Sequence, residues 1–226
     1  MTAYVIAPPA ETALPVEGGG LFPVRRIYCV GRNYADHARE MGADPDREPP
    51  FFFSKPRDAV ISGEAVPYPP ATGDLHHEVE LVLALGGAGA NLAPEEAGSL
   101  IFGAAVGVDL TRRDLQAEAK KSGRPWDMAK GFDASAPIGL IRPGPAPSSG
   151  KIALSIDGEA RQSGDLAQMI WSNAEILSHL STLVRLEPGD LVFTGTPAGV
   201  GAVGRGSPIE ARADDLPPLR FRLFQA

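Results

Sequence analysis

Residues 76–85, HHEVELVLAL, form the longest β-like run in the chain and carry two of its most informative side chains. Alternation along a strand places Glu78 and Glu80 on one face and the apolar residues Val79 and Leu81 on the other. Two carboxylates spaced in this way repel each other unless solvent screens them or a cation lies between them. The spacing alone therefore leaves two interpretations open, a solvated strand face and a cation-binding strand face.

A third acidic residue ends the other long apolar run. Residues 101–110, IFGAAVGVDL, are typical of a buried strand, and Asp109 stands where that strand leaves its sheet. An unpaired carboxylate at this point would be costly. If Asp109 lies beside Glu78 and Glu80, the three side chains suit a hard cation such as Mg²⁺ or Mn²⁺, with water or substrate as the remaining ligands. We expect such an open site to be catalytic.

The rest of the chain is divided into short elements by 26 glycines and 22 prolines. The further predicted elements are strands over residues 26–30, 51–55 and 64–68, a hairpin over 151–164, and helices over 33–41, 94–98, 111–121 and 172–183. Asp157-Gly158 supplies the tight turn of the hairpin, and capping boxes are predicted at Thr111–Asp114 and Ser172–Glu175. This mixture predicts a β-rich α+β fold in one domain, residues 1–226, on which the extended segment 1–24 packs.

Composition and charge narrow the function classes. The 226 residues include 21 Lys and Arg against 28 Asp and Glu, a formal net charge of −7, and no stretch concentrates the basic residues. Nucleic acid is therefore not an expected partner, because its backbone requires a basic surface. No apolar run reaches the about 18 residues of a membrane helix, and the N-terminus lacks a signal-peptide pattern. With Cys29 as the single cysteine, we expect a cytoplasmic protein with no membrane partner.

The segment GRNYADHAREMG, residues 31–42, contains a candidate general base. His37 and Glu40 are three residues apart on the predicted helix, so they share a face. A carboxylate that orients an imidazole raises its basicity, and the pair can then take a proton from water near neutral pH. The alternative is an ordinary exposed helix face. Because the polar, proline-rich stretch 42–50 follows, residues 33–41 are predicted to act as a lid.

Other motifs are weaker. GVGAVG, residues 199–204, matches the glycine spacing of a dinucleotide-binding turn, but RGSPIEARADDLPP follows in place of the required helix. No phosphate-binding P-loop and no GxSxG nucleophile motif occurs. Lys55 and Lys130 have apolar or aromatic neighbours in FFSKP and WDMAKGFD, so each could be a partly buried cation for an anionic substrate or an ordinary surface lysine.

Six segments taken together resemble the fumarylacetoacetate hydrolase family. They are GRNYADHAREMG, FFFSKP, HHEVELVLALG, GVDLTRRDLQ, WDMAKGFD and GDLVFTGTPAGVG, and they occur in the family's order across residues 25 to 205. Within the family, the chain is most similar to the short, single-domain acylpyruvate hydrolases, in particular the fumarylpyruvate hydrolases of gentisate-type aromatic catabolism. The resemblance implies a mixed β-sandwich roll with short flanking helices, a homodimer, and Mg²⁺ or Mn²⁺ at the site.

The resemblance also assigns roles by motif. The residues that match the family's metal ligands are Glu78, Glu80 and Asp109. Those that match its catalytic pair and the lysine near the developing oxyanion are His37, Glu40 and Lys130. Those on the substrate side are Arg113, Gln116, Thr196 and Lys55.

The implied reaction is cleavage of the carbon–carbon bond of a 2,4-diketo acid, with fumarylpyruvate giving fumarate and pyruvate. Three other reactions of a 2-oxo acid fit the same site, namely oxaloacetate decarboxylation, oxaloacetate tautomerisation and diene-acid isomerisation. A non-catalytic β module with a structural cation is the remaining alternative.

Overall fold

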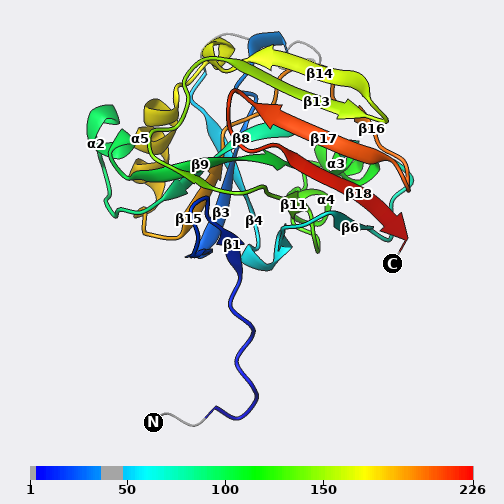
Figure 1. Cartoon of the computed structure of the whole chain (residues 1–226), viewed down its shortest axis with the longest axis horizontal. Coiled ribbons are helices and arrows are strands. Elements are labelled where there is room, and N and C mark those ends of the chain that lie inside the picture. The colour runs from blue at the N-terminus through cyan, green and yellow to red at the C-terminus, as the bar shows by residue number, and fades with distance from the viewer. Residues whose placement is uncertain (1–3, 37–47, 226) are drawn as a thin grey trace.

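The computed structural model describes residues 4–36 and 48–225, which are built around two β-sheets (Figure 1). The six-stranded sheet has the order β12 (Arg142–Pro143), β9 (Ile101–Val108), β8 (Val79–Leu85), β15 (Asp190–Phe193), β3 (Arg26–Gly31) and β4 (Phe51–Lys55). The five-stranded sheet has the order β14 (Glu159–Asp165), β13 (Lys151–Ile156), β17 (Pro208–Ala213), β18 (Leu219–Gln225) and β6 (Ala65–Tyr68). Both sheets are mixed, because β3 runs parallel to β15 and β6 runs parallel to β18.

Smaller elements complete the described residues. The short strands are β1 (Ala13–Pro15) with β2 (Leu21–Pro23), β11 (Ala136–Pro137) with β5 (Val60–Ile61), and β10 (Thr111–Arg112), β7 (Leu75–His77) and β16 (Gly201–Ala202) in one sheet. The helices are α2 (Pro94–Gly98), α3 (Arg113–Lys121), α4 (Asp127–Lys130) and α5 (Asn173–Leu183), with 3₁₀ turns η1 (Arg57–Ala59) and η2 (Leu166–Gln168). None of the helices in the described ranges is long and apolar enough to cross a membrane.

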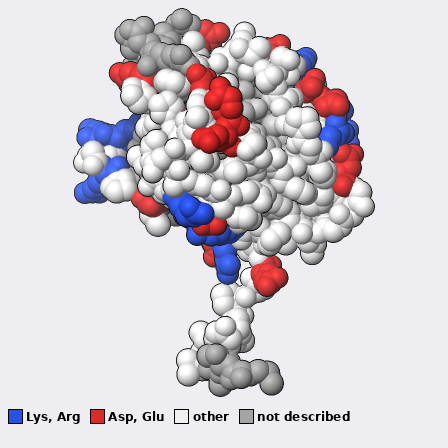
Figure 2. Space-filling model, turned by 90° about the vertical axis from the view of Figure 1, so that its left-hand side faces the viewer, with Lys and Arg blue, Asp and Glu red and all other residues white. Residues whose placement is uncertain are grey.

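The N-terminal segment divides into two parts. Leu14 and Phe22, on the β1–β2 hairpin, are buried in the hydrophobic core. Residues 4–10 instead extend away from the sheets with exposed side chains (Figure 1). Of the segment 1–24 that was predicted to pack on the domain, the hairpin is thus buried in the core and residues 4–10 are exposed. On the face shown in Figure 2, Lys and Arg lie at the margins and most of the surface is uncharged.

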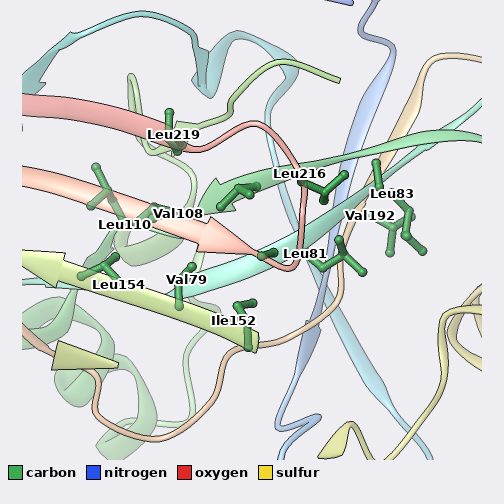
Figure 3. Close-up of a cluster of buried hydrophobic side chains, with 14 of the residues drawn as sticks. Val79, Leu81, Leu83, Val108, Leu110, Ile152, Leu154, Val192, Leu216 and Leu219 are labelled. Carbon is green, nitrogen blue, oxygen red and sulfur yellow. The ribbon is translucent and has the colours of Figure 1, made fainter. Parts of the chain in front are cut away.

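Apolar side chains fill the space between the two sheets (Figure 3). Leu81 and Leu83 of β8 share one buried cluster with Ile152 and Leu154 of β13, all at most 1% exposed. The opposite face of β8 is covered too, because Val82 belongs to a second buried cluster. β8 is thus buried on both faces, and the interpretation of residues 76–85 as a half-solvated strand is wrong.

Local sequence signals predicted several elements correctly. Asp157 and Gly158 both have positive φ, 54° and 81°, as a tight hairpin turn between β13 and β14 requires. The Ser172–Glu175 capping box opens α5, with the Ser172 N–H donating to Glu175 Oε2 at 2.9 Å. Gly201 and Ala202 form a strand that pairs with β7, so the GVGAVG glycines do not lead into a helix.

The predicted capping box at Thr111–Asp114 is wrong. Thr111 pairs with His76 in the ladder between β10 and β7, so it is a strand residue. The Asp114 carboxylate accepts hydrogen bonds from the Thr72 hydroxyl at 2.8 Å and from the Gly73 N–H at 3.0 Å. Pairing between distant segments therefore replaces the local cap at the start of α3.

Candidate active site

The register of two central strands brings the three acidic residues together. β8 and β9 are antiparallel with Glu80 opposite Gly107, and the Asp109 N–H donates to the Glu78 carbonyl at 2.8 Å. One carboxylate oxygen from each of Glu78, Glu80 and Asp109 lies within 4.8 Å of the others. All three residues are buried, at 5%, 2% and 0% exposure. The condition set from sequence, that Asp109 lie beside the two glutamates, is met.

Three cations surround these carboxylates. Lys130 Nζ lies 2.7 Å from both Glu78 Oε2 and Asp109 Oδ2. The Arg113 guanidinium contacts Glu78 Oε1 at 2.5 Å, and Lys55 Nζ lies 2.8 Å from Asp109 Oδ1. Burial lowers the pKa of Lys130, but Asp109 and Glu78 outweigh burial and raise that pKa above its ordinary value. Lys130 is therefore a buried ammonium.

Glu80 is the carboxylate that the cations balance least. Among the described residues it has no Lys or Arg ion-pair partner, and its Oε2 accepts the Gly195 N–H at 2.6 Å. Burial, followed by the charges of Asp109 and Glu78, raises the pKa of Glu80 well above its ordinary value. A cation between the three side chains would remove this repulsion.

The donor set fits a hard divalent cation. Its ligand atoms are carboxylate oxygens, as Mg²⁺ and Mn²⁺ prefer. Asp109 Oδ1 is buried and has no aligned hydrogen-bond donor within the described ranges, although Lys55 Nζ is close. The residues present can therefore hold the predicted metal, and their assignment as its ligands stays a prediction.

Helix α3 and the loop after β15 supply the substrate-side residues. Arg113 and Gln116 are three apart on α3, and the guanidinium donates to Gln116 Oε1 at 2.5 Å. Both line a pocket whose wall includes Glu78, Glu80 and Thr196. The structure thus places three of the four residues expected on the substrate side in one pocket with Glu78 and Glu80.

Lys55 was expected to contact the substrate, but it is not among the residues that line this pocket. Its side chain is fully buried behind Asp109, and its ammonium donates to the backbone carbonyls of Leu110 and Lys130. This geometry makes Lys55 a support for the Asp109 carboxylate.

Gln162 was missed by the sequence reasoning. This buried side chain of β14 accepts from the Val79 N–H at 3.0 Å and bonds His77 Nδ1 at 2.9 Å. Its amide group donates to Thr196 Oγ1 at 2.8 Å and to the Pro197 carbonyl at 2.9 Å. Gln162 thereby connects the five-stranded sheet to the β7–β8 segment and to the loop after β15. A polar residue at a core position of the predicted hairpin was the available signal.

Asn33 was predicted only as the start of a helix, yet its amide holds the loop after β15. It donates to the carbonyls of Thr194 at 2.8 Å and Trp171 at 3.0 Å, and accepts the Trp171 N–H at 2.8 Å. Gly195 has φ +98° and its Cα lies so close to Asn33 that a Cβ would come within 2.7 Å of the Asn33 Cβ. Glycine is required there, and its N–H is aimed at Glu80.

The predicted catalytic pair, His37 and Glu40, lies outside the described residues, as does most of the proposed lid. Of residues 33–41, the structure describes 33–36, of which Asn33 and Tyr34 are buried. The roles of the pair and of the lid stay predictions from sequence.

The chain is similar to a family model and to proteins of known structure. The family model "Fumarylacetoacetate (FAA) hydrolase C-terminal" matches residues 26–224. A solved structure of fumarylpyruvate hydrolase from Pseudomonas aeruginosa, in complex with Mn²⁺ and pyruvate, has a TM-score of 0.95 and 50% identity, covering 99% of this chain and 100% of its own.

Two curated relatives carry different activities. A fumarylpyruvate hydrolase from a Ralstonia species is 44% identical over 191 residues, 82% of this chain and 100% of the relative. A mitochondrial oxaloacetate tautomerase from Rattus norvegicus is 41% identical over 202 residues, 88% and 91% of the two chains. The matches confirm the predicted fold class and the enzyme class, a hydrolase acting on carbon–carbon bonds, against the non-catalytic cation module. The chain belongs to the fumarylacetoacetate hydrolase family.

Proposed function

We propose that this protein is a metal-dependent hydrolase, one catalytic domain, that cleaves fumarylpyruvate into fumarate and pyruvate. The observation that carries the proposal is the buried set of Glu78, Glu80 and Asp109, of which Glu78 and Glu80 line one pocket with Lys130 and Arg113. The likeness to a fumarylpyruvate hydrolase that binds Mn²⁺ and pyruvate supports it.

Glu78, Glu80 and Asp109 would hold Mg²⁺ or Mn²⁺. When bound, the cation supplies Lewis acidity toward the oxygen atoms of a 2-oxo acid. The three carboxylates are already matched by the positive charges of Lys55, Lys130 and Arg113. A loaded site therefore carries net positive charge, which suits a substrate with a carboxylate and an ionisable enol.

Lys130 and Arg113 are placed to hold the pyruvyl part of the substrate. Both are charged groups fixed by Glu78, so their orientation costs little when the substrate binds. Gln116 is buried beside Arg113 and fixes the guanidinium. We expect Lys130 to stabilise negative charge that develops on the departing pyruvate enolate.

His37 and Glu40 would activate the attacking water. In the proposed step, His37 takes one proton while the water oxygen bonds to the 4-carbonyl carbon, which gives a tetrahedral oxyanion. The oxyanion reforms its carbonyl, the bond between carbons 3 and 4 breaks, and its electron pair leaves with the pyruvyl group. That enolate takes up at carbon 3 the proton that His37 accepted, which restores the neutral imidazole, and the products are fumarate and pyruvate.

Oxaloacetate tautomerisation is the second candidate function, because the rat relative with that activity covers most of the chain. It needs proton transfer at carbon 3 but no water as nucleophile. Oxaloacetate decarboxylation would also use the enolate-stabilising groups.

Product analysis separates these reactions. Purified protein is given fumarylpyruvate, acetylpyruvate or oxaloacetate with Mn²⁺, and products are followed by NMR, with a parallel sample in excess chelator. We expect chelator-sensitive formation of equal amounts of fumarate and pyruvate, with oxaloacetate processed more slowly. Rapid keto–enol exchange of oxaloacetate without cleavage of either acylpyruvate would instead identify a tautomerase.

We further propose that the protein is a cytoplasmic homodimer. Family resemblance supports this proposal. Light scattering on the eluting peak of a sizing column should give the mass of two chains, and the mass of one chain would contradict the dimer.

A further inference from the structure

Two cations at the mouth of the pocket have no part in the proposed chemistry. Arg32 directly follows β3, and Lys120 lies near the end of α3. Both line the same pocket as Glu78 and Glu80. Lys120 comes four residues after Gln116 and seven after Arg113, so all three project from one helix face. The positive lining therefore continues from the carboxylates to the pocket entrance.

Arg32 and Lys120 each make a cation–π contact with an aromatic ring. The Arg32 guanidinium carbon is 5.5 Å from the centre of the Phe51 ring, and Lys120 Nζ is 5.2 Å from that of Trp126. Within the described ranges, neither cation has a carboxylate as ion-pair partner. The Phe51 and Trp126 rings pack edge to face, 5.5 Å apart, so the two cations sit on one continuous aromatic wall.

The two cations repel each other, and Arg32 also has a strained backbone. Arg32 has φ 60°, a left-handed conformation that is strained for a residue with a side chain. Burial, together with the like charges of Arg113 and Arg32, lowers the pKa of Lys120. An anion between Arg32 and Lys120 would relieve their repulsion.

We infer that Arg32 and Lys120 bind the distal carboxylate of a dicarboxylic acyl group. The inference rests on the proposed function, which places the pyruvyl end of the substrate at the carboxylates and Lys130. The acyl chain then leads toward the pocket mouth along Phe51 and Trp126, whose flat rings suit a planar, conjugated chain. Fumarylpyruvate has such a chain with a terminal carboxylate, whereas acetylpyruvate ends in a methyl group.

The kinetic test compares substrates that differ in this carboxylate. The variants are Lys120→Gln and Arg32→Asn, because asparagine tolerates the left-handed backbone. Each should lower the ratio of kcat/KM for fumarylpyruvate to kcat/KM for acetylpyruvate about tenfold, the size expected for one charge-assisted hydrogen bond. Lys120→Arg should restore most of the ratio. Lys121→Gln removes the same charge one position along the helix and should leave the ratio as in the wild type.

A uniform loss would overturn the inference. If both substrates lose the same factor, and the loss disappears in high salt, Arg32 and Lys120 only attract anions in general. An unchanged ratio in both variants would equally contradict a subsite.

Binding of the product acid provides a readout that does not depend on turnover. Fumarate and crotonate share a carbon skeleton, with a methyl group in crotonate in place of one carboxylate. Calorimetry with Mn²⁺ present should show wild-type protein binding fumarate about tenfold more tightly than crotonate, with this preference lost in Lys120→Gln. Equal binding by the wild type would overturn the subsite whatever the turnover. A fumarate preference in a protein that cleaves neither acylpyruvate would overturn the proposed hydrolase alone.

Discussion

Single carboxylates in this site differ by what surrounds them. Glu78 and Asp109 share the Lys130 ammonium, while Glu80 receives one backbone N–H from Gly195. The charge that Glu80 adds to a buried acidic group is therefore the least compensated of the three. Glu80 is the residue at which metal binding and the stability of the metal-free fold oppose each other most directly.

Glu80→Gln should stabilise the metal-free protein and abolish its response to metal. The glutamine oxygen can still accept the Gly195 N–H, but the repulsion from Asp109 and Glu78 is gone. In chelator we expect the Tm to rise by about 2–4 °C, equivalent to about 1 kcal/mol in a chain of this length. Wild type should gain thermal stability with Mn²⁺ and the variant should not. Scanning calorimetry measures both, and a full Mn²⁺ response in Glu80→Gln would rule out Glu80 as a ligand.

Lys55→Met should be strongly destabilising. Methionine fills the space of the buried stem but leaves Asp109 without the ammonium at 2.8 Å. Removing one partner of a buried ion pair costs about 3 kcal/mol or more. Urea unfolding in chelator should show this loss in the free energy of unfolding. Lys121→Met, at an exposed position, is the control, and equal stability of the two variants would show that Lys55 does not support Asp109.

Site residues that can be recognised from their local spacing along the chain could be predicted from the sequence. Glu78 and Glu80 alternate along the strand that the sequence predicts over residues 76–85, and Asp109 ends an apolar run. The partners of Asn33 and Gln162 could not be predicted, because the Asn33 amide reaches residues 138 and 161 positions away and Gln162 reaches His77 across 85. Lys120 could have been found from its helical spacing to Gln116.

At the scale of elements, the site is built where β7 ends and β8 begins. Glu78 is the single residue between these strands, which belong to different sheets. Local signals predicted the β13–β14 hairpin because its turn residues are adjacent. They failed at Thr111, where the ladder to β7 competes with a helix cap. The interruption at Glu78 could not be predicted, since it depends on pairing with β10 and β16.

Gln162→Met should loosen this junction. The substitution leaves four polar groups around the former amide, on His77, Val79, Thr196 and Pro197, without that partner. We expect a loss of about 3 kcal/mol in the free energy of unfolding, because each buried polar group left unpaired is penalised. Chemical denaturation measures the loss. Its matched control, Arg161→Met, changes an exposed neighbour on β14. Similar small losses in the free energy of unfolding for both variants would show that Gln162 does not stabilise the junction.

Strand β7 should make the stability of the fold depend on pH. Burial lowers the pKa of His77 below its ordinary value of 6.5, and burial also lowers that of His76. The native state then binds these protons less tightly than the unfolded chain, so stability falls as the pH drops from about 6.5. The Tm of wild type, measured in chelator between pH 7.5 and 5, should fall more steeply than that of His77→Asn. Parallel plots of Tm against pH for the two proteins would show that His77 does not contribute to the pH dependence of stability.

For the whole molecule, the two-sheet sandwich explains why an acidic protein can present a basic pocket. The net charge is −7, yet Arg32, Lys120 and Arg113 line one opening. β8 and β9 lie centrally in the six-stranded sheet and also pack on the five-stranded sheet, so the carboxylates at their ends are held from several sides. Composition, with its many glycines and prolines, predicted the fold class. It could not predict this local reversal of charge, which arises only when distant segments meet.

Restoring the chelated protein with Mn²⁺ shows whether Glu78, Glu80 and Asp109 bind a metal that turnover requires. Metal-free wild type and Asp109→Asn are titrated with Mn²⁺ while free metal is followed by electron paramagnetic resonance and cleavage of fumarylpyruvate is assayed in the same samples. We predict that wild type takes up one Mn²⁺ per chain, that turnover rises in proportion to the bound metal, and that the variant shows neither response. Full turnover in the metal-free protein, or wild-type Mn²⁺ uptake by Asp109→Asn, would contradict the account.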